Sequence, residues 1–161
     1  MSNAAPQFRT ELRQATYEDC LTLAPNLRQE DKDEVWESHS HLPEEALLES
    51  LKASPDAQVA TVDGEVICMF GVAPTLELDV GIPWLLGTPR IKEVSSEFLK
   101  RNKPVLSGIS SGYKLLVNYV WSRNTEHIRW LQWLGFTVIR TPIFLGRNRE
   151  IFYSFYMYQK E

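Results

Sequence analysis

The stretch NTEHIRWLQWLGF, residues 124–136, is the part of the sequence that decides the fold. Asn124 is a favoured residue at the start of a helix, and the apolar residues after it recur at helical spacing. Leu-Gly-Phe ends the helix, because glycine readily adopts the left-handed conformation found at helix ends. The stretch therefore predicts a short amphipathic helix that stops at Gly135 and leads into a strand.

Outward from that helix, alternating apolar residues predict β-strands. The hairpin signal is strongest at Asp63-Gly64, which separates two alternating runs and favours a two-residue turn. YKLLVNYVW, just upstream of the helix, is expected near the centre of the sheet. Gly146-Arg147-Asn148 separates the last two strands. The predicted strands cover residues 8–14, 57–62, 65–72, 81–86, 113–121, 136–145 and 150–158.

Four further segments show helical spacing or helix-start signals: residues 17–27, 28–41, 44–51 and 90–111. Thr16 and Asp19 form a weaker version of the capping box at the start of the first segment. Val35 and Trp36 are the only large apolar residues of the charged second segment. We therefore expect a surface helix there, docked by those two side chains. Pro104 should kink or split the last helix.

Length and composition are those of one ordinary globular domain. Of the 161 residues, 43% are hydrophobic and 24% charged, so the chain can bury a core without disulfides or metal. Cys20 and Cys68 are expected to be free thiols in a reducing compartment, filling the core. The element order predicts an α/β (α+β) domain over residues 1–161: a mixed, largely antiparallel sheet flanked by helices. Residues 1–7 are expected to be flexible.

Charge and hydropathy argue against two classes of partner. A net charge of −4 is unfavourable for a protein whose main partner is nucleic acid. No apolar run approaches the roughly 18 residues of a membrane span. His39-Ser40-His41 could chelate a metal, but no acidic residue completes a recognised ligand spacing. A solvated loop and no metal site are therefore expected.

The element order and the stretch 124–136 resemble the GNAT acetyltransferase superfamily. Its closing signature is an asparagine, an apolar-faced helix and Gly-Phe entering a strand. LRQEDKDEVWESH, GIPWLLGT, LLVNYV and NTEHIRWLQWLGF together are also similar to a family of small proteins of short-tailed bacteriophages, labelled internal virion protein A. The resemblance implies a GNAT-like fold and a place in the host cytoplasm, in the phage virion, or in both.

The resemblance also implies where a cofactor would bind. In the superfamily, one strand splays from its neighbour to meet the pantetheine arm, and a Gln/Arg-x-x-Gly-x-Gly/Ala loop wraps the pyrophosphate at a helix N-terminus. The corresponding turn here is shorter, and Pro89 removes an N–H donor. No cofactor is therefore expected, or acetyl-CoA if the chain is an active enzyme. The residues that would bind it are Trp84, Leu85, Leu86, Gly87, Thr88, Arg90 and Asn124.

A second implication concerns the proton transfers of acetyl transfer. Seven positions after the asparagine, where the superfamily often has a tyrosine acid, this chain has Leu131. Tyr119 and Tyr113 are alternative acids. Glu34 and Glu37 are candidate bases, although an acidic surface helix also explains the two glutamates. A basic set could replace the lost loop or simply be solvated: Lys92, Lys100, Arg101, Lys103, Arg140, Arg147 and Arg149.

Three functions remain open from the sequence. The first is a phage protein of the virion, its assembly or its ejection, catalytically degenerate and acting by binding a phage or host protein. The alternative is an acetyl-CoA-dependent N-acetyltransferase that modifies a host or phage protein. The third is a small-ligand module that uses the splayed groove. If the chain binds proteins, the expected surfaces are a groove at Trp84 and the exposed face of residues 152–158.

Overall fold

The two-residue turn at Asp63 and Gly64 is the local feature from which the sheet is built. In the computed structural model, which describes residues 9–159, the two residues have φ angles of 49° and 84°. These left-handed conformations match the twist of the flanking strands, β2 (Gln58–Val62) and β3 (Glu65–Pro74), which pair antiparallel. The hairpin predicted from the sequence is confirmed.

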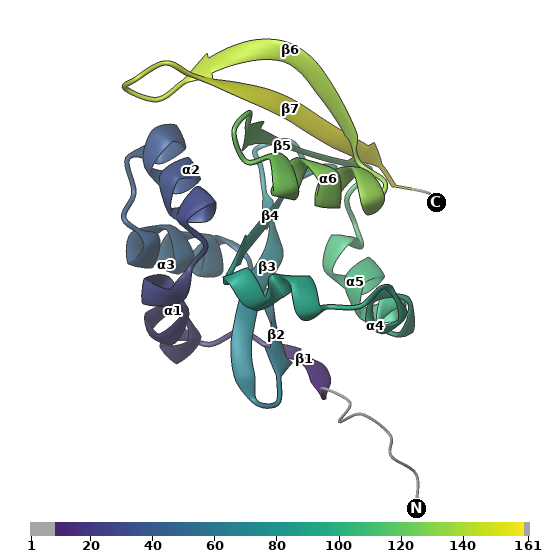
Figure 1. Cartoon of the computed structure of the whole chain (residues 1–161). Coiled ribbons are helices and arrows are strands. Elements are labelled where there is room, and N and C mark those ends of the chain that lie inside the picture. Colours follow the sequence, from purple (N-terminus) through teal and green to yellow (C-terminus); the bar gives the residue numbers. More distant parts are fainter. Residues whose placement is uncertain (1–8, 160–161) are drawn as a thin grey trace, which may run out of the picture.

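Seven strands form one sheet in the order β1-β2-β3-β4-β5-β7-β6 (Figure 1). Every neighbouring pair is antiparallel except β4 and β5, so the predicted mixed, largely antiparallel sheet is confirmed. The predicted flexible end and Phe8 of the first predicted strand lie outside the described residues. The other strands are β1 (Thr10–Gln14), β4 (Val80–Gly87), β5 (Leu115–Trp121), β6 (Thr137–Leu145) and β7 (Glu150–Tyr158).

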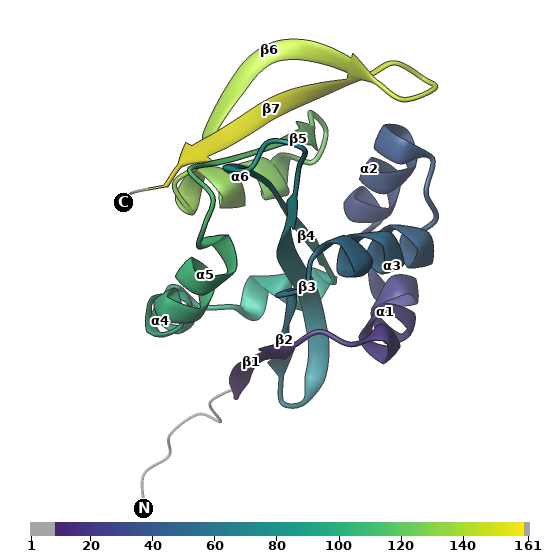
Figure 2. The same ribbon diagram turned by 180° about the vertical axis from the view of Figure 1, so that it is seen from behind.

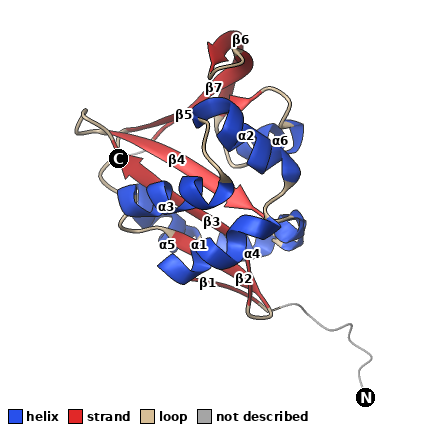
Figure 3. Cartoon of the chain, turned by 90° about the vertical axis from the view of Figure 1, so that its left-hand side faces the viewer, coloured by secondary structure: helices blue, strands red, loops and turns tan. Residues whose placement is uncertain are grey.

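Helices cover both faces of the sheet (Figure 3). One face carries α1 (Tyr17–Leu23), the 3-10 turn η1 (Ala24–Asn26), α2 (Gln29–His39) and α3 (Pro43–Ala53). The other face carries the 3-10 turn η2 (Pro89–Glu93), α4 (Ser96–Arg101), α5 (Lys103–Ser110) and α6 (Thr125–Trp133). Among residues 9–159, no helix is long and apolar enough to cross a membrane.

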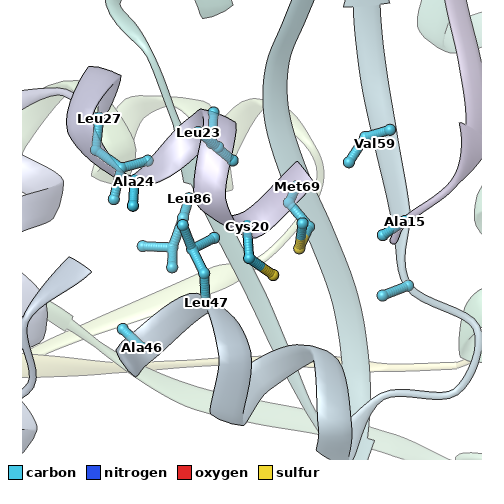
Figure 4. Packing of buried hydrophobic residues seen from close by; sticks show 11 residues of the cluster. Ala15, Cys20, Leu23, Ala24, Leu27, Ala46, Leu47, Val59, Met69 and Leu86 are labelled. Atoms are coloured by element: carbon cyan, nitrogen blue, oxygen red, sulfur yellow. The ribbon is translucent and has the colours of Figure 1, made fainter. Parts of the chain in front are cut away.

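The main core lies between α1, α3 and strands β2 to β4 (Figure 4). Cys20 and Leu47 from the helices meet Met69 of β3 there, and all three are 0% exposed. Cys68 is buried in a second cluster with Ile91 of η2. Both cysteines are free and buried, as predicted. A third cluster packs α6 against β5 and β7.

The first helix begins at a capping box, as predicted. The Thr16 N–H donates to Asp19 Oδ2 at 2.8 Å, and the Asp19 N–H donates to Thr16 Oγ1 at 3.4 Å. The helix ends at Leu23 rather than continuing to residue 27. Pro25 lies in the next turn, η1, because a proline is not accommodated inside a helix.

The helix predicted for residues 90–111, with a kink or split at Pro104, is also interrupted at a second place. The segment forms η2, α4 and α5, because the Ser95 hydroxyl caps a new helix by accepting the Phe98 N–H at 3.1 Å. Pro104 lies in the first turn of α5, so the predicted split at this proline is confirmed. Gly135 has a φ of 105° just after α6, which confirms that the helix ends there with a positive φ.

Candidate functional site

Strands β4 and β5 separate soon after they meet. Their only paired positions are Val80 with Leu115 and Gly81 with Leu116, at the start of both strands. Beyond these pairs the two strands diverge, as the view from behind shows (Figure 2). The backbone groups that face this opening need other hydrogen-bond partners.

Asn118 of β5 spans the opening near its closed end. Its Nδ2 donates to the Pro83 carbonyl of β4 at 2.8 Å, and its Oδ1 accepts the Tyr119 N–H at 2.8 Å. One side-chain amide therefore replaces hydrogen bonds that paired strands would exchange at this level. Pro83 itself has no N–H to donate.

Helix α2 closes the wide end of the same opening with two carboxylates. Asp31 Oδ2 accepts the Gly87 N–H at the end of β4 at 3.0 Å. Glu34 Oε1 accepts the Trp121 N–H at the end of β5 at 2.7 Å. The Arg28 N–H, just before α2, donates to the Gly87 carbonyl at 2.8 Å. The ends of both strands are thus joined to α2.

The backbone groups of the opening are therefore largely satisfied by the protein itself. Since hydrogen-bonding groups alternate between the two sides of a strand, Pro83, Leu85 and Gly87 of β4 face the opening. Of these, Pro83 and Gly87 already have partners. On β5 the same alternation selects Tyr119 and Trp121, and both N–H groups are bonded. On β4, Leu85 is the residue left to bind a ligand through its backbone.

A buried polar network holds α2 in this place. The Arg28 guanidinium donates to Asp31 Oδ1 at 3.1 Å and to Asn124 Oδ1 at 3.2 Å. Asn124 Nδ2 donates to Asp31 Oδ1 at 3.1 Å. Asp31 and Asn124 are 0% exposed and Arg28 is 6% exposed. Loss of one partner would leave a buried charge uncompensated, which is strongly destabilising.

Asn124 has a different role from the one its sequence position indicates. It occupies the residue before α6, yet its side chain makes no capping hydrogen bond. The side chain instead joins α6 to α2 through the network with Arg28 and Asp31. The asparagine of the sequence signature is therefore committed to a contact between helices.

Glu34 and His127 face each other beside this network. Their side chains are 12% and 9% exposed, and Glu34 Oε2 lies 3.8 Å from His127 Nδ1. Burial, followed by the negative charge of Asp31, raises the pKa of Glu34 to about 8. Burial also lowers the pKa of His127. The raised pKa keeps Glu34 a candidate for proton transfer, although one of its oxygens is occupied by the Trp121 N–H.

Glu37, the other candidate base, binds the turn between β6 and β7. Its carboxylate oxygens accept from Asn148 Nδ2 at 3.1 and 3.3 Å. Gly146 of that turn packs directly on the Glu37 backbone.

The prediction that Trp36 docks α2 is wrong, because this side chain is 44% exposed. Val35 does pack against the core, as predicted, and the buried acidic residues provide the remaining contacts.

The turn after β4, where the resemblance implies a pyrophosphate, has its N–H groups bonded within the chain. The Thr88 N–H donates to the Ile67 carbonyl at 2.8 Å, and the Arg90 N–H donates to Thr88 Oγ1 at 3.2 Å. The Ile91 N–H donates to the Thr88 carbonyl at 3.0 Å. Pro89 has no N–H. An anion would have to displace these bonds to be held by the backbone.

The basic side chains do not gather into one anion site. The Arg90 guanidinium is paired with Glu65 and Glu93. Lys92 Nζ lies 3.5 Å from Glu126, and the Arg140 guanidinium lies over the Tyr153 ring. Lys100, Arg101 and Lys103 belong to the α4–α5 region, whereas Arg147 and Arg149 lie in the β6–β7 turn, on the opposite side of the fold (Figure 1).

The three side chains before Gly87 pack against neighbouring core residues. Trp84 is half-buried against the main core, and its Nε1–H donates to Ser54 Oγ at 2.7 Å. Leu86 is 5% exposed in the same core. Leu85 packs with the second core cluster on the opposite face. Trp84 is thus packed against the core and bonded to Ser54, while the residue stays partly exposed.

The position of the superfamily's tyrosine acid is filled by a buried leucine. Leu131 is 6% exposed and packs with Val120 and Phe155. Tyr119, the alternative acid, is 47% exposed on β5, two residues before Trp121 and so on the same face of the strand. The hydroxyl of Tyr119 therefore lies on the face that α2 only partly covers.

Sequence reasoning missed three residues of this region: Asn118, Asp31 and His127. Spacing could have drawn attention to one of them, because Arg28, Asp31 and Glu34 recur every three residues and so share a helix face. No local signal marks Asn118, since its partner Pro83 is 35 positions away.

One family profile and many solved structures are similar to this chain. The profile describes a probable scaffold protein, Gp13, of bacteriophage T7 and matches residues 84–140, about a third of the chain. The matched segment runs from β4 to β6 and includes Asn118 and Asn124. No curated protein matches the sequence at a significant level.

Among solved structures, a GNAT-family acetyltransferase from Bacillus anthracis aligns with a TM-score of 0.66 and 8% identity, over 95% of this chain and 96% of that one. YncA of Salmonella typhimurium, solved with its cofactor acetyl-CoA, aligns at 0.62 and 19% identity, over 94% and 95%. Ard1 of Thermoplasma volcanium aligns at 0.62 and 13%, over 94% and 99%. The chain therefore has the GNAT fold and carries, within it, a segment similar to a phage T7 scaffold protein.

Proposed function

We propose that this chain is a phage protein of the virion, its assembly or its ejection, which works by binding another protein on a GNAT scaffold that no longer uses acetyl-CoA. Its site of action would be the host cytoplasm, the virion, or both. The observation that carries the proposal is the internally bonded opening between β4 and β5. Asn118, Asp31 and Glu34 occupy backbone groups that a pantetheine arm would need.

Two further observations support the loss of cofactor binding. The N–H groups of Thr88, Arg90 and Ile91 are bonded within the turn after β4. The Arg90 side chain is neutralised by Glu65 and Glu93. The match to a phage scaffold protein supports protein partners, because a scaffold acts through such contacts.

The surface best suited to a partner is the uncovered part of the sheet face beside α2. We define this open face by Tyr119, Ile139, Tyr156 and Tyr158; Tyr119 and Ile139 lie on either side of Ser154 in the β5–β7–β6 register. Tyr119, Ile139 and Tyr158 are 47%, 42% and 71% exposed. Aromatic residues are enriched at interfaces. Phe152, at the other end of the predicted surface, is fully buried.

The alternative is an acetyl-CoA-dependent N-acetyltransferase that modifies a host or phage protein. The GNAT fold and the raised pKa of Glu34 favour it. Calorimetric titration of the full chain with acetyl-CoA separates the two functions. We expect no affinity tighter than about 100 μM, some 5.5 kcal/mol. Micromolar binding, or CoA retained through purification, would instead establish the cofactor and favour the alternative.

A capture experiment tests the protein-binding function directly. The immobilised chain is exposed to purified structural proteins of the phage and to host extract, and bound proteins are identified. A Tyr119→Ser, Ile139→Ser variant should lose the partner while keeping its melting temperature, because both side chains are exposed. Tyr17→Ser is the matched control, since Tyr17 is 59% exposed on α1. Equal capture by all three proteins would eliminate the open face as the binding surface.

A further inference from the structure

Three buried side chains from two helices bring potential metal-ligating atoms close together. Asp31 and Glu34 lie on α2, and His127 lies on α6. One ligand atom from each residue lies within 4.8 Å of the other two. His127 lies more than 90 positions after the two carboxylates in sequence, so the cluster exists only after α2 and α6 have packed together.

The three residues keep lone pairs that no other group uses. His127 Nδ1 is buried without a hydrogen-bond partner, in a side chain that is 9% exposed. An orphaned buried nitrogen of this kind requires an explanation. Glu34 bonds the Trp121 N–H through Oε1, while Oε2 faces His127 Nδ1 at 3.8 Å. Asp31 Oδ2 accepts only the Gly87 N–H, so one of its two lone pairs stays available.

The two carboxylates of the cluster have one arginine beside them. Arg28 is the one cationic group in contact with Asp31, and it compensates one carboxylate. Among the described residues, Glu34 forms an ion pair with no lysine or arginine, and its Oε2 faces His127 Nδ1 at 3.8 Å. Glu30 and Glu126 also approach Arg28, at 3.6 and 3.3 Å, and Lys92 Nζ lies 3.5 Å from Glu126. A divalent cation beside Glu34 would pair with the ionised form of this carboxylate.

We propose that Asp31, Glu34 and His127 form a binding site for one first-row divalent transition metal, of which Zn²⁺ is the representative. An imidazole nitrogen with two carboxylate oxygens is a donor set that such ions accept, whereas Mg²⁺ and Ca²⁺ prefer oxygen alone. Water would complete the coordination. The metal would replace a proton on Glu34 and tie α2 to α6 beside the opening between β4 and β5.

A metal-free arrangement could satisfy the same atoms. A protonated Glu34 carboxyl could donate from Oε2 to His127 Nδ1 after a small approach of the two side chains. The two arrangements differ in what they bind: only the proposed site takes up Zn²⁺ or Co²⁺ in a defined ratio. They also differ in their spectra, because Co²⁺ bound by imidazole and carboxylate absorbs visible light.

The experiment uses the full chain stripped by a chelator and titrated with Zn²⁺ in a calorimeter and with Co²⁺ in a spectrophotometer. We expect one ion per chain and a higher melting temperature with Zn²⁺. Glu34→Gln and His127→Gln should each weaken the binding of Zn²⁺ at least tenfold. Glu34→Gln is the gentler change, because its amide oxygen can still accept the Trp121 N–H.

The control is a double variant, His39→Ala and His41→Ala in one chain, which lacks the other two histidines of the sequence. Their rings stack at 5.5 Å near the end of α2 and could bind a metal by themselves. This double variant should bind Zn²⁺ as the unmodified chain does. Three results would overturn the site: no 1:1 binding, binding lost in the His39, His41 variant, or binding unchanged in both Glu34→Gln and His127→Gln.

Discussion

The contact between the β6–β7 turn and α2 depends on a single glycine, Gly146. Its φ is 77°, a conformation that side chains disfavour. A Cβ built on Gly146 would lie 1.7 Å from the Glu37 carbonyl oxygen and 2.9 Å from its carbon. Because Glu37 is part of a helix backbone, the turn must move away from α2 to accept Gly146→Ala.

The expected cost has two parts. A residue other than glycine in the left-handed region costs roughly 1–2 kcal/mol. Displacement of the turn also breaks the hydrogen bonds from Asn148 to Glu37, each worth about 0.5–1.5 kcal/mol in an exposed setting. Gly146→Ala should therefore lower the free energy of unfolding by about 2–5 kcal/mol.

Gly64→Ala is the matched control. Gly64 also lies in a hairpin turn, with a φ of 84°, but an added Cβ would have no atom within 4 Å. It should cost only the conformational part, roughly 1–2 kcal/mol. Equilibrium urea unfolding of both variants measures the difference. Equal losses of stability would refute the claim that the turn is packed on Glu37.

Three further predictions follow from individual contacts. Trp84→Ala should cost about 3 kcal/mol in urea unfolding, because the ring packs against the main core and bonds Ser54; a near-neutral change would show that these contacts contribute little. Burial alone would raise the pKa of Asp19, but hydrogen bonds from Arg13 and Thr16 lower it. Asp19→Ala should therefore destabilise the chain at neutral pH, and the difference should shrink as the pH falls below about 3.9. A pH-independent difference would contradict this pairing. Gly135→Ala should lower stability by roughly 1 kcal/mol and Gly135→Val by more, because φ is 105°; coincident melting curves for Gly135→Val and the unmodified chain would show that α6 ends by another means.

Features that depend on neighbouring residues could be read from the sequence. The Asp63-Gly64 turn, the capping box of Thr16 and Asp19, and the helix end at Gly135 each involve residues a few positions apart. Their conformational preferences act before any tertiary contact forms. The order of helices and strands along the chain could be predicted in the same way, and the GNAT-like fold was implied by the resemblance. The short turn at Pro89 could likewise be recognised as a poor phosphate site.

Predictions from local residue spacing were wrong where a residue distant in sequence determined the structure. Helix α2 was expected to dock through Val35 and Trp36 alone, because carboxylates are normally solvated. Asp31 is instead fully buried, since the fold supplies Arg28, Asn124 and the Gly87 N–H as partners. The helix predicted through residues 94 and 95 also failed, because Ser95 begins a new helix there.

Only the tertiary structure determines whether the backbone groups in the opening between β4 and β5 are bonded within the chain. The residues predicted a helix after Asn124 and a turn too short for the phosphate loop, and the resemblance implied a splayed strand. The sequence could not show that Glu34 would bond the Trp121 N–H, 87 positions away, or that Asn118 would reach Pro83. A buried polar side chain is tolerated only when the folded chain brings a partner to it. Such partners come from separate elements, so they exist only once those elements have packed.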